Sequence, residues 1–492
     1  MQFGSIVTLL AVFLILAQTF EYDTEYDIGE LITCEEDCKC DHTEPSTITC
    51  DKVKFEEEDL TTANLKLMDK SAIYKVVKLT NNRIKMLNKK QIVPQLAKNV
   101  EELDFSDNLI RAIDDKAFDD FAKLKVLKLS DNHLDFEDME NVFTSKLGKS
   151  LDRLYLDHNK QLNDVPKGFF DGLTNLKTLV LDGNVNLELT DKTFGKGMKN
   201  LEELSLDDCN ISDLPLGIFD GLPKLQRLSL RGNPFTKIPD AINKIKNLKI
   251  LDLSETSITE MTENSLSNDH SIQHLIMQNL EYLTMIDNCA FCGLQELKVI
   301  DFSDCKHLFS INDNAFGSKS KQTPPKLEEV HFDNCNLSTL HEDLANWEDL
   351  KKLSIGGNPL NCDCNLKWLL DNPHLQTFNG VTPTCAQPES LKDMPLNKVN
   401  DKVCPQAKIN TGIFSEPKKR KCLSFVALVL AITFVVLVLV AIFGFIQYTR
   451  RRGRLTNVFY RPELPQMSYN KLPTNPDLMS KSYTYSIQQE KA

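Results

Sequence analysis

Residues 201–211 read LEELSLDDCNI, and residues 225–235 read LQRLSLRGNPF. In both stretches leucine occupies positions 1, 4 and 6, cysteine or asparagine occupies position 9, and an apolar residue occupies position 11. The frame recurs along the chain, and position 1 of successive copies falls at residues 74, 100, 124, 151, 176, 201, 225, 248, 272, 297, 327 and 350. Twelve copies at spacings of 23 to 30 residues predict a protein built from structural repeats.

Each part of the frame has a predicted structural role. The leucines should point into a core between two layers, and position 9 should satisfy backbone groups in the turn after a short strand. Each copy can bury its core only against its neighbours, so the predicted product is an α/β repeat solenoid. The copy that begins at Ile272 departs from the frame because Leu280 takes position 9, and we expect a local distortion there.

Aromatic residues and thiols extend the predicted core. A phenylalanine lies at about position 19 or 20 of six copies and should fill the convex layer: Phe118, Phe170, Phe194, Phe219, Phe291 and Phe316. Cysteine takes position 9 in three copies: Cys209, Cys305 and Cys335. We interpret these three cysteines as reduced core thiols, since each replaces a small buried residue.

Further cysteines lie on both sides of the repeats. One set precedes them: Cys34, Cys38, Cys40 and Cys50. The other set follows them, beginning within NPLNCDCNLKWL at residues 358–369: Cys362, Cys364, Cys385 and Cys404. Sequence alone leaves three disulfide pairings open for each set. A zinc cluster is the competing interpretation, and the signal peptide predicted below disfavours it.

With these ends, residues 34–404 resemble the extracellular leucine-rich-repeat proteins with paired cysteine-rich caps, in their single-pass membrane form. The resemblance implies a horseshoe with a parallel sheet on its concave side, capped by disulfide modules. It also implies the pairs Cys34–Cys40, Cys38–Cys50, Cys362–Cys385 and Cys364–Cys404. Known members act in adhesion, synapse recognition, growth-factor modulation or innate sensing.

Two apolar segments set the predicted topology. Residues 1–19 are interpreted as a signal peptide, because their apolar run is too short to cross a bilayer and acidic sequence follows it. A buried strand or helix is the alternative. Residues 423–448 carry no charge and no polar face, and they are long enough to form one transmembrane helix. The prediction is a single-pass type I protein of the plasma membrane with its N-terminal part outside the cell.

The remaining predicted boundaries follow from these segments. They are an acidic lead at 20–33, an N-terminal cap at 34–73, about twelve repeats at 74–360, a C-terminal cap at 361–404, a juxtamembrane stalk at 405–422 and a cytoplasmic tail at 449–492.

The charge distribution excludes some functions. The net charge is -13, but residues 418–421 contribute +4 and residues 449–492 contribute +5, which leaves -22 for the remainder. A body this acidic is a poor match for a phosphate backbone, so we expect no nucleic-acid partner. The sequence shows no catalytic constellation and no phosphate-binding glycine loop. We therefore predict no enzyme activity, no cofactor and no bound metal.

The predicted ligand site lies on the concave face, where positions 3, 5 and 7 should be exposed. Position 7 of three consecutive copies is Asp157, Asp182 and Asp207. Strands about 4.8 Å apart would hold these like charges close together at some cost, so the row is a candidate site for a basic protein or a cation. Five further residues complete the predicted set: Arg153, Tyr155, Asp208, Arg227 and Arg231. The competing interpretation is that an acidic ectodomain places aspartate in every solvated row.

Other motifs suggest modification or sorting. Asn210 and Asn336 begin N-glycosylation sequons. Cys289 and Cys292 could form a local disulfide, and Cys422 could link two chains. In the tail, the motif from Tyr469 to Leu472 resembles a tyrosine-based endocytic signal. Two further tail residues could be phosphorylated: Tyr483 and Tyr485.

The leading functional hypothesis is a cell-surface protein-binding module that acts in adhesion or as a receptor or co-receptor. Its partners would be an extracellular protein or a second copy of the chain, with membrane lipid around the transmembrane helix. The alternative is a signalling receptor that recruits cytoplasmic adaptors through its tyrosine-containing tail.

Overall fold

The computed structural model describes residues 38–53, 73–89, 92–93, 96–266, 271–317, 324–347, 350–372, 381–399 and 402–404. All of them belong to the compact unit that ends at Gln406. The predicted signal peptide, acidic lead, juxtamembrane stalk, transmembrane segment and tail lie outside the described residues. Within the described ranges, no helix is both long enough and apolar enough to cross a membrane.

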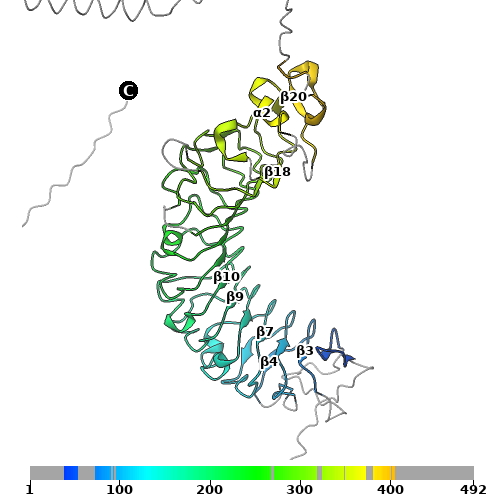
Figure 1. The fold of residues 1–492 in the computed structure, drawn as a ribbon. Coiled ribbons are helices and arrows are strands. Elements are labelled where there is room, and N and C mark those ends of the chain that lie inside the picture. The colour runs from blue at the N-terminus through cyan, green and yellow to red at the C-terminus, as the bar shows by residue number, and fades with distance from the viewer. Residues whose placement is uncertain are drawn as a thin grey trace, which may run out of the picture. The chain divides into compact units, whose positions relative to one another are not determined.

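One sheet of 14 strands runs through this unit, and Figure 1 shows its strands along the inner side of an arc. The first two strands, β1 (Lys39–Asp41) and β2 (Thr47–Thr49), pair antiparallel. The other twelve pair parallel and in register: β3 (Val76–Lys78), β5 (Glu102–Asp104), β7 (Val126–Lys128), β8 (Arg153–Tyr155), β9 (Thr178–Val180), β10 (Glu203–Ser205), β11 (Arg227–Ser229), β12 (Ile250–Asp252), β13 (His274–Ile276), β15 (Val299–Asp301), β17 (Glu329–His331) and β18 (Lys352–Ser354).

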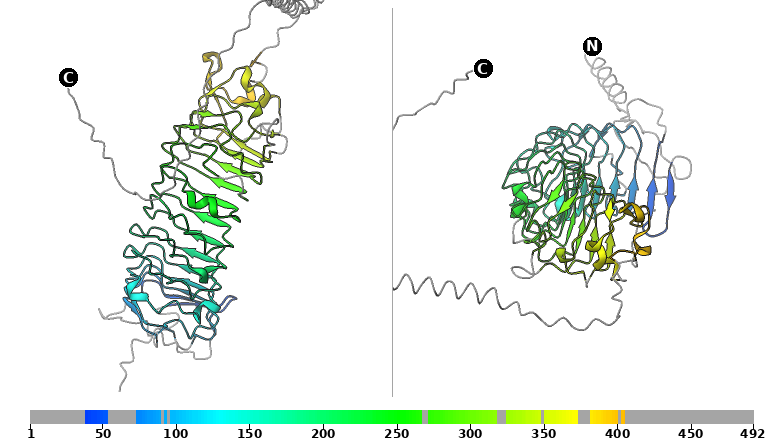
Figure 2. Two further views of the ribbon diagram at one scale, coloured as in Figure 1. Left: turned by 90° about the vertical axis from the view of Figure 1, so that its left-hand side faces the viewer. Right: turned by 90° about the horizontal axis from the view of Figure 1, so that it is seen from above.

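Each parallel strand begins at position 3 of a predicted repeat, so the frame found in the sequence is confirmed. Figure 2 shows the strands as a single ladder. Leucines at positions 1, 4 and 6, such as Leu201, Leu204 and Leu206, are fully buried. The six phenylalanines predicted to fill the far layer are also buried, and the rings of Phe291 and Phe316 stack with centroids 4.8 Å apart. The predicted parallel-sheet solenoid is therefore confirmed.

The side opposite the sheet contains little α-helix. Two short parallel ladders lie there, β4 (Met86–Leu87) with β6 (Ala112–Ile113) and β14 (Met285–Ile286) with β16 (Ser310–Ile311). The remaining short elements are 3-10 helices at Glu137–Met139, Leu147–Lys149, Lys196–Met198, Asp240–Lys244, Glu342–Leu344, Cys364–Leu366, Glu389–Leu391 and Leu396–Lys398. Among the described residues, the α part of the predicted α/β class is limited to α2 (Lys367–Leu370) in the C-terminal cap. Most repeats span 23 to 26 residues, which leaves room for a turn rather than a long helix.

Asparagine or cysteine at position 9 joins its repeat to the one before it. The side-chain amide of Asn132 donates to the carbonyl of Phe105 in the preceding repeat at 3.0 Å, and its Oδ1 accepts from the backbone N–H of Ile110 at 2.9 Å. Both groups are buried, and the N–H of Ile110 depends on this partner, whereas the carbonyl of Phe105 also accepts from Asn108 at 2.9 Å. The Cys209 thiol donates to the carbonyl of Leu181 in the same way. Cys209, Cys305 and Cys335 are free and buried, as predicted, and burial raises the pKa of Cys209 to about 12.

The sheet shows no distortion at β13, the strand of the repeat that contains Leu280, so the expected distortion was wrong. The strand β13 pairs in register with both of its neighbours, and Leu280 is fully buried. A position-9 asparagine here would pair with the carbonyl of Leu253, as its equivalents do. The hydroxyl of Thr256 donates to that carbonyl at 2.8 Å instead, so an apolar residue fits without leaving this acceptor unpaired.

Disulfides close both ends of the repeats. Cys38 pairs with Cys50, and in the C-terminal cap two pairs form, Cys362–Cys385 and Cys364–Cys404. These three match the pairing that the resemblance implies. Cys40 is also disulfide-bonded, whereas Cys34 lies outside the described residues. The local disulfide between Cys289 and Cys292 is present. In the cap, β19 (Leu360–Asn361) pairs with β20 (Cys385–Gln387).

Candidate functional site

The residue at position 8 of each repeat adopts a left-handed backbone conformation. Its φ lies between +52° and +71° in all twelve repeats: Asn81, Asp107, Asp131, His158, Gly183, Asp208, Gly232, Glu255, Asn279, Asp304, Asn334 and Gly357. Asparagine, aspartate and glycine tolerate this conformation best, and they fill ten of the twelve positions. The turn directs the chain away from the sheet and leaves the non-glycine residues at this position exposed at the ends of the strands.

Acidic residues occur at position 7 or 8 of eight of the twelve repeats, and we call this set the acidic edge. Its members are Asp107, Asp131, Asp157, Asp182, Asp207, Asp208, Glu255, Asp304 and Asp333. The sequence analysis identified four of these nine acids and did not treat position 8 as a row. The repeated Asn, Asp and Gly at position 8, which are typical of positive φ, were the signal that could have identified it. Arg231 is the only lysine or arginine at these two positions of the twelve repeats.

The opposite edge of the sheet has a different charge pattern. Position 2 alternates acids and bases, which form ion pairs between neighbouring repeats: Lys125–Glu101 at 2.7 Å, Lys177–Asp152 at 3.4 Å and Lys351–Glu328 at 2.6 Å. The acidic composition therefore does not place carboxylates alone in every solvated row. Among the charged residues at positions 7 and 8, carboxylates outnumber lysine and arginine by nine to one, whereas position 2 alternates acids and bases.

The three aspartates of the predicted row lie at the ends of β8, β9 and β10, on adjacent strands, but they are half-buried rather than fully exposed. Asp182 Oδ1 accepts from the backbone N–H of Asp207 at 2.9 Å. Asp207 Oδ1 accepts from the Ser229 hydroxyl and, at 2.9 Å, from the backbone N–H of Arg231. Each of these two carboxylates thus uses one oxygen to hold the next repeat, a structural role that the sequence did not reveal.

The position of these groups alters their acidity. Burial raises the pKa of Asp207 to about 6, and the negative charge of Asp182 acts in the same direction. Burial also raises the pKa of Asp182, with a contribution from the charge of Asp157. Asp182 and Asp207 therefore ionise less readily than a free aspartate does, and an approaching positive charge would favour their ionised form.

Replacing Asp207 with asparagine is expected to raise the free energy of unfolding at pH 7.5 by about 1–2 kcal/mol. The amide oxygen can still accept from Ser229 and Arg231, while the buried charge is removed. The pKa of Asp207 is higher in the folded protein, about 6, than its ordinary value of 3.8. The neutral carboxyl therefore does not destabilise the fold below pH 3.8, and the fold becomes less stable as the pH rises through about 6 and the carboxyl ionises. The native protein and the variant should therefore have nearly the same free energy of unfolding near pH 4. Denaturant unfolding at both pH values measures it, and a variant that is less stable at pH 7.5 would contradict the assignment.

The structure separates the other predicted ligand residues into two groups. Arg153 and Tyr155 lie on β8, on the same face as the row, and Lys128 Nζ lies 6.0 Å from the centroid of the Tyr155 ring. Arg227 and Arg231 instead pair with carboxylates of neighbouring repeats: Arg227 Nε lies 3.2 Å from Glu203 Oε1, and Arg231 donates to Glu255. Asp208 is exposed, at position 8 beside Asp207. The Arg231–Glu255 pair therefore reduces the charge at one point of the acidic edge, while the Arg227–Glu203 pair lies at position 3 within the strands.

The two sequon asparagines, Asn210 and Asn336, are exposed at position 10, two residues beyond the acidic edge. The predicted tail residues Tyr469, Leu472, Tyr483 and Tyr485 lie outside the described residues, as does Cys422.

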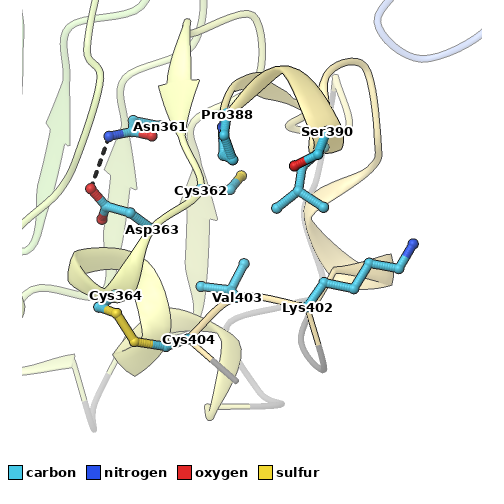
Figure 3. A pocket seen from close by; sticks show the side chains of 10 residues that line it. Asn361, Cys362, Asp363, Cys364, Pro388, Ser390, Lys402, Val403 and Cys404 are labelled. Carbon is cyan, nitrogen blue, oxygen red and sulfur yellow. Dashed lines mark hydrogen bonds between the residues drawn. A yellow bond between two sulfur atoms is a disulfide. The ribbon is translucent and has the colours of Figure 1, made fainter. Parts of the chain in front are cut away.

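A cavity of about 580 Å³ lies in the C-terminal cap, away from the sheet (Figure 3). Leu391, Val403 and the Cys364–Cys404 disulfide form much of its wall. The Asp363 side chain is hydrogen-bonded to Asn361 at 2.8 Å, and Lys402 is exposed at the rim. The residues that line this cavity include no nucleophile–base pair.

A family model described as leucine rich repeat matches residues 75–134 and 184–235. The match identifies leucine-rich repeats in these two segments, and the same strand and position-9 pattern extends along the rest of the solenoid.

Two curated proteins share short segments with this chain. The leucine-rich repeat and immunoglobulin-like domain-containing nogo receptor-interacting protein 2 of Mus musculus is 51% identical over 45 residues, and its Homo sapiens counterpart is 43% identical over 44 residues. Each alignment covers 9% of this chain and 7% of the relative. The similarity is thus limited to a short segment, and the chain spans only 7% of the length of these relatives.

Proposed function

We propose that the protein is a cell-surface receptor or adhesion protein that binds an extracellular protein on the concave face, where the acidic edge contacts basic side chains of the partner. The acidic edge carries this proposal, because nine carboxylates of one sign line the ends of the strands while the opposite edge is charge-paired. Placing single-sign charge on one surface is costly for the isolated protein and favours an oppositely charged partner.

Three further observations support an extracellular role. The caps contain disulfides, which persist in oxidising compartments. Residues 1–19 and 423–448 have the composition of a signal peptide and a membrane span. The relatives that share short segments are described as receptor-interacting proteins. We therefore place the repeats outside the cell, anchored in the plasma membrane by residues 423–448.

The experiment that tests this function displays the full chain on cells and probes it with a library of secreted proteins and ectodomains. A partner that binds saturably, and whose affinity falls at least tenfold between 50 and 300 mM salt, is the expected result, since exposed charge pairs are screened by salt. Saturable binding that does not change with salt would contradict a role for the acidic edge. Binding of no partner would contradict the receptor function itself.

Recruitment of cytoplasmic adaptors to the tail is a separate prediction. Replacing Tyr469, Tyr483 and Tyr485 with phenylalanine should leave extracellular binding unchanged and remove recruitment.

A further inference from the structure

Two neighbouring repeats bring two carboxylates and an imidazole together within the acidic edge. Asp131 takes position 8 of one repeat, and Asp157 and His158 take positions 7 and 8 of the next. One ligand atom from each of the three side chains lies within 4.8 Å of the other two. His158 Nδ1 lies 3.2 Å from Asp157 Oδ2. His158 and Asp131 are both exposed, so a small ion can reach the group from solvent.

The donor atoms fit one class of metal ion. Zinc binds imidazole nitrogen and carboxylate oxygen at about 2.0–2.2 Å in tetrahedral geometry, which places two ligand atoms roughly 3.3 Å apart. The Asp157–His158 pair already has this separation. Asp131 lies within 4.8 Å of both partners, so it needs to move by at most about 1.5 Å to match this separation, and an exposed side chain can do so by a rotamer change. Calcium and magnesium prefer oxygen ligands alone, so the imidazole favours a zinc-like ion.

Residues behind the group hold two of the ligands in place. The Ser130 hydroxyl donates to Asp157 Oδ1 at 2.6 Å, which leaves Oδ2 facing the imidazole. Such hydrogen bonds orient ligands in established metal sites. On the other side, the His158 ring lies directly against Gly183, where a Cβ would come within 2.6 Å of the ring. Any larger residue at Gly183 would displace the imidazole.

The surroundings also favour a dication. Asp107 and Asp182 occupy the neighbouring positions of the acidic edge, and no lysine or arginine occupies position 7 or 8 of the three repeats that begin at residues 124, 151 and 176. The charges that oppose this stretch are those of His158, when it is protonated, and of Lys160, which acts on Asp131. A bound dication would relieve the repulsion along this part of the edge.

We propose that Asp131, Asp157 and His158 form a three-ligand site for a divalent transition-metal ion of the zinc class, with water completing the coordination. The competing explanation of the same contact is a simple histidine–carboxylate ion pair, which would bind no metal. The two explanations differ in a measurable way.

The test titrates zinc chloride into the tag-free full chain after removal of metals with a chelator, followed by calorimetry. We expect one saturable site, and a dissociation constant at least tenfold higher in the His158→Gln and Asp157→Asn variants. His307→Ala serves as the matched control, because His307 is also exposed but lies in a distant repeat. It should leave binding unchanged.

A second variant tests the contact between Gly183 and the His158 ring rather than the three ligands. Gly183→Ala keeps all three ligands and should still weaken zinc binding at least tenfold by displacing the imidazole, while thermal unfolding checks that the variant is folded. Absence of saturable zinc binding, equal zinc binding by the His158→Gln variant, or tighter binding of calcium than of zinc would each overturn the proposal. The zinc proposal does not depend on the receptor function. If the chain bound zinc but no protein partner, that result would contradict the receptor function and leave the zinc site standing.

Discussion

Replacing Asn159 with alanine is expected to lower the free energy of unfolding by about 2–4 kcal/mol, because the change removes the acceptor of a buried backbone N–H and one of the two side-chain donors to each of two buried carbonyls. Asn159 is fully buried. Its Oδ1 accepts from the backbone N–H of Leu134 at 3.1 Å, and its Nδ2 donates to the carbonyls of Leu129 at 2.9 Å and Leu156 at 3.0 Å. Each buried group left unpaired costs about 1–3 kcal/mol. Denaturant unfolding of the purified chain measures the loss.

Two companion variants make this prediction specific. Asn186→Ala removes one exposed hydrogen bond, to the carbonyl of Lys160, and should cost no more than about 1 kcal/mol. Asn159→Cys should recover part of the lost stability, because Cys209, Cys305 and Cys335 occupy the same slot and donate to the equivalent carbonyl. Equal stability of the alanine and cysteine variants would show that the position-9 ladder is not what holds the repeats together.

The second large effect concerns the C-terminal cap. Replacing Cys364 and Cys404 together with serine should lower the free energy of unfolding by about 2–5 kcal/mol and greatly reduce delivery of the protein to the cell surface. This disulfide closes a loop with a sequence separation of 40, next to the stacked rings of Trp347 and Trp368 at the end of the solenoid. Without it, the apolar end of the last repeat loses its cover.

The matched control replaces Cys289 and Cys292, whose disulfide spans a separation of only 3. A shorter loop contributes less to stability through chain entropy, about half as much in the simplest account. Surface delivery of this control should therefore stay close to that of the native protein. If both double variants reached the surface equally well, the cap would not be the element that protects the end of the repeats.

The sequence predicted the repeat register well because the buried leucines and the position-9 residue respond to local, periodic constraints. Each of the twelve parallel strands begins where the frame places it. The disulfide pairs of the C-terminal cap were implied by resemblance and not by spacing, since spacing alone leaves three pairings open. The buried leucine at Leu280 was misjudged because its compensation comes from Thr256 in another repeat.

The candidate site was predicted only in part, for a related reason. Asp157, Asp182 and Asp207 were recognised, but their hydrogen bonds depend on which backbone groups the next repeat presents. The arginines expected to close the row pair with Glu203 and Glu255, which are distant in sequence and adjacent in the sheet. The exposed acids of position 8 were missed because their orientation follows from a left-handed backbone and not from hydrophobic periodicity.

The central claim is that the acidic edge binds a basic protein partner, and a matched pair of variants tests it most directly. The edge variant carries Asp107→Asn, Asp208→Asn and Asp304→Asn, all exposed at position 8. The control removes the same number of exposed charges outside positions 2 to 8: Glu140→Gln, Asp220→Asn and Glu263→Gln.

Both variants and the native chain, displayed on cells, are probed in parallel with one array of secreted proteins and ectodomains. We predict that at least one protein binds the native chain and the control alike, and binds the edge variant at least tenfold more weakly, which corresponds to about 1.4 kcal/mol from three lost charge contacts. Equal binding to all three chains would contradict the claim.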